Sequence, residues 1–101
     1  MMDYSKPKRL TSSGHVVERS CVMSNFSIKP GSDDVIVFFR DGESDGTVVW
    51  SAEADNASGS HAESFVPPMR FANKLYVEIQ TSGNNANVSV ALVEPASTTD
   101  I

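Results

Sequence analysis

The chain has 101 residues, a formal net charge of −5 and one cysteine, Cys21. Its length is typical of a single domain, and no stretch approaches the roughly 20 apolar residues that a membrane-spanning helix needs. One cysteine excludes an intrachain disulfide. Because small domains without disulfides often gain stability by association, the composition favours a homo-oligomer.

The charge is unevenly distributed along the sequence. Residues 1–13 carry Lys6, Lys8 and Arg9 against Asp3, a charge of +2, which leaves −7 on the remainder. An acidic body argues against nucleic acid as the main partner, because phosphate contacts need a basic face. Three cations are also a weak basis for a membrane-binding surface. The first ten residues lack the apolar run of a secretory signal, so we expect synthesis in a cytoplasm and no membrane partner.

The first half of the sequence predicts strands separated by turns. Residues 21–29 alternate, with Val22, Phe26 and Ile28 on one face. A turn at 30–33 follows, and the continuously apolar segment 35–39 indicates a strand covered on both faces. The acidic stretch Asp41–Gly46 then predicts a hairpin loop.

The second half continues this pattern. Residues 47–53 alternate with Trp50 on the expected core face, and 54–60 are small and polar, typical of an exposed loop. A short strand at 64–66 is expected to stop at Pro67-Pro68. Residues 74–80 and 87–93 alternate cleanly around a second predicted hairpin loop at 81–86.

These elements predict an all-β, six- to seven-stranded antiparallel sandwich or jelly-roll-like domain with extended termini. The expected divisions are a basic arm over 1–13, a β-sandwich domain over 14–94 and a polar tail over 95–101. The predicted core consists of Val22, Phe26, Ile28, Ile36, Phe38, Trp50, Phe65, Leu75, Val77, Ile79, Val88, Val90 and Leu92.

Catalytic chemistry finds little support in the sequence. His15 and His61 are the two histidines and Cys21 is the one thiol, and each lies in a different segment without a recognisable motif. A general base needs a positioned partner, so we interpret both histidines as ordinary surface or strand residues and Cys21 as a small buried residue. We expect no enzyme activity and no cofactor.

The loop after the second predicted strand resembles the start of a calcium-binding loop. Asp41, Glu43 and Asp45 alternate and Gly46 follows in the sixth place, as in an EF-hand. The twelfth position is Ala52, however, where an EF-hand has a bidentate glutamate. We therefore interpret these carboxylates as a solvated acidic turn and expect no metal site.

Two kinds of binding surface stay open. β-Sandwich carbohydrate modules expose aromatic rings and amides, a role that Trp50, Tyr76, Asn84 and Asn85 could fill. Alternatively, residues 4–10 form an arm that orders on a neighbouring subunit. The residues that we hypothesise to bind a protein partner are Tyr4, Lys6, Lys8, Arg9, Leu10 and Tyr76.

Four segments in order resemble a group of small tailed-bacteriophage proteins. They are Val35 to Gly42, Gly46 to Trp50, Phe65 to Phe71 and Lys74 to Ile79, within a likeness that covers about Val16 to Val93. Each follows a strand pattern of that group, which includes a strand ending in Asp-Gly, a Gly-Thr strand and a proline-bearing segment. Asn73-Lys74 departs from the more usual Asn-Gly, which affects the expected tight turn before the last of these strands.

The resemblance implies a non-enzymatic structural role in a virus particle made in a host cytoplasm. Members of this kind resemble capsid decoration or cement proteins, which bind the major capsid protein or other virion proteins, commonly as trimers. A head–tail connector, tail or fibre-attachment component is the alternative within this class. A carbohydrate-binding β-sandwich module is the alternative outside it.

Overall fold

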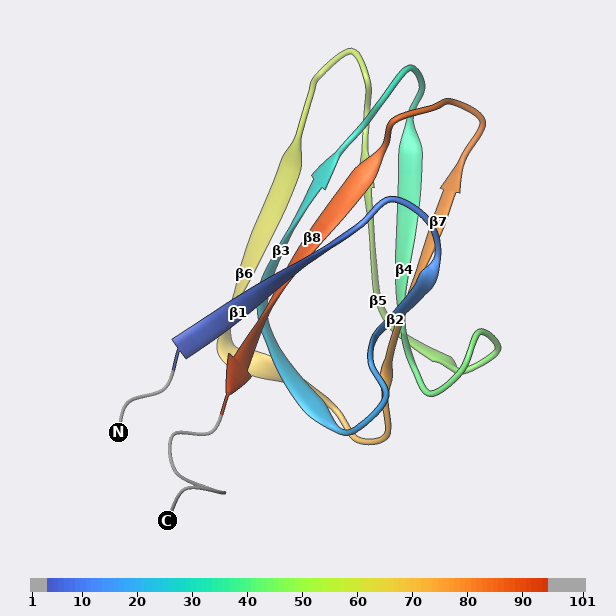
Figure 1. Cartoon of the computed structure of the whole chain (residues 1–101). Coiled ribbons are helices and arrows are strands. Elements are labelled where there is room, and N and C mark those ends of the chain that lie inside the picture. The colour runs from blue at the N-terminus through green and yellow to red at the C-terminus, as the bar shows by residue number, and fades with distance from the viewer. Residues whose placement is uncertain (1–3, 95–101) are drawn as a thin grey trace.

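The computed structural model of the chain describes residues 4–94, and that range contains eight β-strands and no helix that could cross a membrane (Figure 1). The prediction of an all-β, antiparallel domain is confirmed, but the predicted count of six to seven strands is too low. The strands are β1 (Tyr4–Leu10), β2 (Gly14–Val17), β3 (Cys21–Lys29), β4 (Val35–Asp41), β5 (Thr47–Ala54), β6 (His61–Phe71), β7 (Leu75–Thr81) and β8 (Asn87–Glu94).

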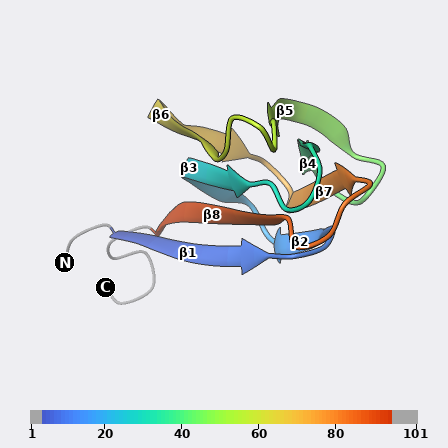
Figure 2. The same cartoon turned by 90° about the horizontal axis from the view of Figure 1, so that it is seen from above.

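Two four-stranded sheets are built from nested strand pairs. Sheet A has the order β1-β8-β3-β6, and sheet B has the order β2-β7-β4-β5. The first strand pairs with the last, the second with the second last, and so on inward, giving the pairs β1–β8, β2–β7, β3–β6 and β4–β5. Successive pairs in this series lie alternately in sheet A and sheet B. The pairs β3–β8 and β4–β7 complete each sheet. Seen from above, β5 and β6 lie along one side of the molecule, and β1 and β2 lie along the other (Figure 2).

Among the described strands, β4 and β5 are the only sequence neighbours that pair with each other. Their connection confirms the predicted acidic hairpin loop, in which Gly42 has a φ of 116°. The predicted second hairpin at 81–86 is wrong, because β7 and β8 lie in different sheets. That connection instead packs on the β3–β4 loop, where the Ser32 N–H donates to the Asn84 carbonyl oxygen over 2.9 Å.

The N-terminal segment is part of sheet A. Its pairing with β8 runs from Tyr4 opposite Glu94 to Leu10 opposite Val88. The expected free arm over residues 1–13 is therefore corrected for residues 4–10, which form β1. Without β1, β8 would present unpaired N–H and C=O groups at the sheet edge, and pairing through the backbone needs few apolar side chains. Residues 1–3 and the predicted tail at 95–101 lie outside the described residues.

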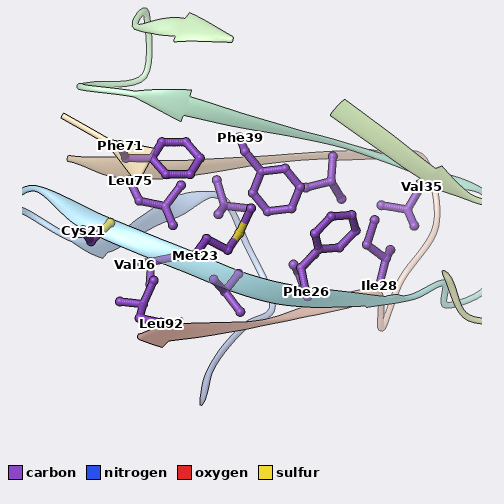
Figure 3. Close-up of a cluster of buried hydrophobic side chains, with 14 of the residues drawn as sticks. Val16, Cys21, Met23, Phe26, Ile28, Val35, Phe39, Phe71, Leu75 and Leu92 are labelled. Atoms are coloured by element: carbon purple, nitrogen blue, oxygen red, sulfur yellow. The ribbon is translucent and has the colours of Figure 1, made fainter. Parts of the chain in front are cut away.

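The core fills the space between the inner faces of the two sheets (Figure 3). Phe26 of β3 and Phe39 of β4 meet across it, with ring centroids 4.7 Å apart. Cys21 is buried there, as predicted. The predicted core residues that are buried are Phe26, Ile28, Leu75, Val77, Val88, Val90 and Leu92; further buried residues include Val16, Met23, Val35, Val37, Phe39, Ala54, Phe71 and Ala86.

The predicted inner faces of β3 and β4 are partly wrong. In β3 the pairing register shifts between Met23 and Asn25, so the residues that face the core before the shift are one position out of phase with those after it. Met23 is therefore buried in place of Val22. In β4 the apolar run carries no alternation, and its outer face is open, with Ile36 39% exposed and Phe38 half-buried.

The edge strand β6 continues past Pro67-Pro68, where the sequence predicted an end. Its partner β3 pairs through Met23 with Met69 and through Asn25 with Ser64, so residues 65–68 bulge out of the ladder. Prolines are tolerated at such a position, because an edge strand needs fewer N–H donors. Phe65, like Ile79, is only partly buried, although both were predicted core residues.

Candidate interaction surface

Part of the basic segment that we expected to bind a partner makes contacts within the domain. Lys8 Nζ lies 3.1 Å from the Val16 carbonyl oxygen and 3.4 Å from that of His15, both on β2. Leu10 is half-buried and packs against the core, and Arg9 is exposed. The side chains of Tyr4 and Lys6 lie outside the described part. This segment is therefore a structural edge strand.

Tyr76 lies on β7, in the other sheet. Its ring meets that of His15 edge-on, with centroids 5.0 Å apart. His15 Nε2 is in turn 3.2 Å from the Gly42 carbonyl oxygen and 3.2 Å from Glu43 Oε1. Tyr76 is thus half-buried in a local cluster that ties β2 and β7 to the acidic loop. The six predicted partner residues are divided between the sheets.

The four residues proposed for sugar binding do not form one platform. Trp50 pairs with Phe39, whereas Tyr76 pairs with Arg40, so the two aromatics lie on opposite faces of sheet B. Asn84 and Asn85 lie in the loop that follows β7, beyond the end of that strand opposite to Tyr76.

The carboxylates of the acidic loop hold the neighbouring backbone in place. Asp41 accepts hydrogen bonds from the backbone N–H groups of Asn73 (2.9 Å), Ala72 (3.2 Å) and Lys74 (3.3 Å). Partial desolvation acts to raise the pKa of Asp41, but these hydrogen bonds outweigh it and lower the pKa. Glu43 pairs with Lys74, and this hydrogen bond lowers the pKa of Glu43 and raises that of Lys74.

Within residues 4–94, no group of three or more His, Cys, Asp and Glu side chains could hold a metal ion. His15 lies on β2 of sheet B and His61 on β6 of sheet A, so the two histidines do not form one site.

A hollow of about 270 Å³ lies at the end of β5. Asp34, Glu53 and Asp55 contribute carboxylates to its lining, together with the serines of the β5–β6 loop. His61 also lines the hollow, and its Nε2 lies 2.8 Å from Glu63 Oε2. The hollow therefore places acidic groups beside the end of an edge strand.

The two edge strands β5 and β6 carry exposed apolar side chains. Trp50 of β5 is 37% exposed and stands edge-on to Phe65 of β6, with centroids 5.4 Å apart. Val66, which follows Phe65, is 97% exposed. We call Val48, Val49, Trp50, Phe65 and Val66 the β5–β6 edge surface.

The lack of charged residues in β5 is a sequence signal for this surface, and the alternation of apolar and polar residues does not reveal it. Residues 47–52 contain no charge, and the next segment of similar character, 64–68, includes two prolines. An uncharged strand is equally consistent with burial and with an exposed edge. The prediction of Trp50 as a core residue is corrected, because β5 has no neighbour on its outer side in sheet B.

Comparison with known proteins adds no relative. The chain matches no family model, and no curated protein or solved structure is significantly similar to it. Its geometry is therefore the basis for a functional proposal.

Proposed function

We propose that this chain is a non-enzymatic structural protein of a virus particle, made in a host cytoplasm, with a jelly-roll fold. It docks through the β5–β6 edge surface on other virion proteins. In the most specific form of the proposal, it is a capsid decoration or cement protein that binds the assembled lattice of the major capsid protein.

The strand order supports a jelly roll. Eight strands in nested pairs, with successive pairs lying alternately in two sheets, are the arrangement of that fold, which combines two Greek keys. Jelly rolls occur in viral capsid domains and in lectins. Because a fold hosts several functions, this order supports the class and leaves the role to the surface.

The β5–β6 edge surface is the observation that carries the proposal. Four of the five large apolar residues that are exposed in the described range belong to this surface: Val48, Val49 and Trp50 on β5, and Val66 on β6. Val66 follows Phe65, the residue that Trp50 contacts. Exposed large apolar groups with polar neighbours mark protein interaction sites. Here the acidic hollow at the end of β5 supplies polar neighbours. The resemblance to small phage virion proteins favours an assembled lattice as the partner.

The proposal is tested on particles of the virus that encodes this chain. Mass spectrometry of purified particles should find the chain in many copies, and a reconstruction should place its density on the capsid surface. Density at the connector, tail or fibre would replace decoration by that alternative role. The absence of the chain from particles would overturn the virion proposal, and tight binding to a glycan array would favour the carbohydrate module.

A paired substitution tests the surface itself. Val66→Glu places a charge on a side chain that is already almost fully exposed, so the fold should tolerate it. Ser27→Glu places the same charge on an exposed position of β3 in sheet A. Recombinant Val66→Glu should bind particles at least about tenfold more weakly than wild type, a loss of roughly 1.4 kcal/mol. Ser27→Glu should bind normally, and equal loss by both variants would contradict the assignment of the surface.

A further inference from the structure

We infer that β5 pairs, edge to edge, with β5 of a second copy of this chain. The inference rests on the proposed role of the β5–β6 edge surface as a protein interface, and it names the partner. β5 is hydrogen-bonded to β4 on one side only. Its other side is a row of backbone N–H and C=O groups that can accept another strand. Pairing would join the two copies of sheet B into one continuous sheet.

The other three sheet edges carry features that discourage such pairing. β1 has Pro7 between Lys6 and Lys8, and β2 is only four residues long with a register shift. β6 is interrupted by the bulge at residues 65–68. Lysines, prolines, bulges and shortness are the usual protections of exposed edges. β5 has a register shift of its own, which leaves Val49 without a direct partner on β4. The rest of the strand, from Trp50 to Ala54, pairs regularly, and β5 contains neither proline nor lysine, so it is the least protected of the four edges.

The charges of β5 favour an antiparallel arrangement of two copies. Residues 47–52 are uncharged, and Glu53 is the one charged residue of the strand. With a two-fold axis at Ser51, the two Glu53 residues lie on opposite sides of the axis. The two carboxylates are then roughly 14 Å apart along the strand, at about 3.4 Å per residue. A parallel arrangement would place them side by side, which costs free energy.

The same register is complementary in side-chain size. Trp50 and Ala52 pair with Phe39 and Val37 of β4, which are buried, so both face the inner side of the sheet. An axis at Ser51 places each Trp50 opposite Ala52 of the second copy. A large ring therefore meets a small side chain twice by symmetry. This contact would cover part of the exposed Trp50 surface, as expected of an isologous interface.

Sedimentation equilibrium at micromolar concentrations tests the pairing. The wild-type chain should show a monomer–dimer equilibrium. Ser51→Lys places two positive charges opposite each other at the axis and should weaken association about tenfold or more. Ser64→Lys makes the same change at an exposed position of the other edge strand on this side, β6, and should leave association unchanged. Circular dichroism checks that both variants keep the β fold.

Cross-linking gives a second, independent measurement. Directly opposed residues of an antiparallel pair have Cα atoms about 4.5–5.5 Å apart, within the range that a disulfide spans. Ser51→Cys should therefore form a covalent dimer under mild oxidation, and Ser64→Cys should not. A wild-type chain that stays monomeric, or a Ser51→Cys variant that fails to cross-link, would overturn the inference. So would a trimer that is insensitive to Ser51→Lys.

The two proposals fail in distinguishable ways. A monomeric wild-type chain that still binds particles overturns only the β5 pairing and leaves the virion role in place. A β5-linked dimer from a chain that is absent from particles supports the pairing and overturns the virion role.

Discussion

Trp50 stands edge-on to Phe65, with ring centroids 5.4 Å apart and ring planes at 81°. The two residues belong to β5 and β6, the edge strands of different sheets, so this contact closes the core on that side of the molecule. Phe65 continues the contact inward to Phe26, at 5.9 Å. Contacts between aromatic rings therefore connect Phe26 in the buried core with Trp50 on the exposed surface that we propose as the interface.

Two adjacent phenylalanines of β4 should differ sharply in their contribution to stability. Phe39 is fully buried, and Phe39→Ala should lower the free energy of unfolding by about 3–5 kcal/mol. Phe38 lies on the outer face, half-buried, with the Arg40 guanidinium 5.7 Å from its ring centroid, and Phe38→Ala should cost about 1 kcal/mol. Urea denaturation measures both values. Equal losses would show that the assigned phase of β4 is wrong.

The same pair of residues shows what the sequence could predict about the fold. Strands with clean alternation, such as 74–80 and 87–93, were placed with the correct inner face, because their polar residues mark the outer side. The run from Val35 to Phe39 has no polar residue, so its phase had to come from the tertiary structure. The bulge at Ser24 changes which alternate residues of β3 face the core, and no local residue pattern predicts a bulge of this kind.

The candidate site was less predictable than the fold. A free arm and a β-strand have the same local sequence when the strand pairs only through its backbone, which is why β1 was interpreted as an arm. Whether an uncharged strand such as β5 is central or at an edge depends on strand order. That order follows from nested pairing between distant segments, and short-range patterns do not encode it.

Gly31 should be intolerant of a side chain. A Cβ at this position would lie 1.6 Å from the Asn84 carbonyl oxygen, because the β3–β4 and β7–β8 loops pack backbone against backbone. Gly31→Ala should therefore lower the free energy of unfolding by about 1–3 kcal/mol. Gly14→Ala is the matched control, since no atom lies within 4 Å of its added Cβ. Thermal denaturation of the two variants should separate them, and an unchanged Gly31→Ala midpoint would contradict the loop packing.

Acid should destabilise the domain through its hydrogen-bonded carboxylates. A hydrogen bond from Ser82 lowers the pKa of Asp33, and those from Gln80 and Arg40 lower the pKa of Glu78, as for Asp41 and Glu43. The unfolded chain then binds more protons than the folded chain. Stability from these groups is present above the ordinary carboxyl pKa of about 4 and is lost as the pH falls through the lowered folded values.

Asp41→Asn tests this acid sensitivity. It weakens the acceptor for three backbone N–H groups, and at this solvated site it should cost about 1 kcal/mol at neutral pH. It should also make the fall of the melting midpoint below about pH 4 less steep, because one contributing carboxyl is gone. Asp45→Asn, in the same loop, accepts none of these hydrogen bonds and serves as the control. A midpoint that rises on acidification would contradict the sign.

Removal of residues 1–10 should destabilise the domain. A free arm would be dispensable for folding, but β1 covers the edge of β8 and Leu10 packs on the core. Its deletion should lower the melting midpoint by several degrees, since about 1 kcal/mol corresponds to roughly 4–8 °C in a domain of this size. The exposed β8 edge should also promote aggregation. A truncated chain with the wild-type midpoint would restore the arm interpretation.

The salt dependence of self-association separates β5 pairing from docking by the basic segment. Two copies that each carry a net charge of −5 repel each other. The β5 interface places apolar and backbone groups together and holds the two Glu53 carboxylates roughly 14 Å apart. That separation is within the Debye length of about 30 Å at 0.01 M ionic strength and beyond the length of about 8 Å at 0.15 M. Added salt should therefore tighten the dimer by several-fold.

Glu53→Gln identifies the origin of that effect. The substitution removes the one charge of β5, so it should tighten the dimer at low salt and reduce the salt dependence of association. Glu18 is an exposed residue just after β2, and Glu18→Gln should change this salt dependence less. Docking of Lys6, Lys8 and Arg9 on an acidic surface would have the opposite sign, because salt screens attraction between exposed opposite charges. A dimer that dissociates as salt is added would therefore contradict pairing through β5 and favour contact through the basic strand.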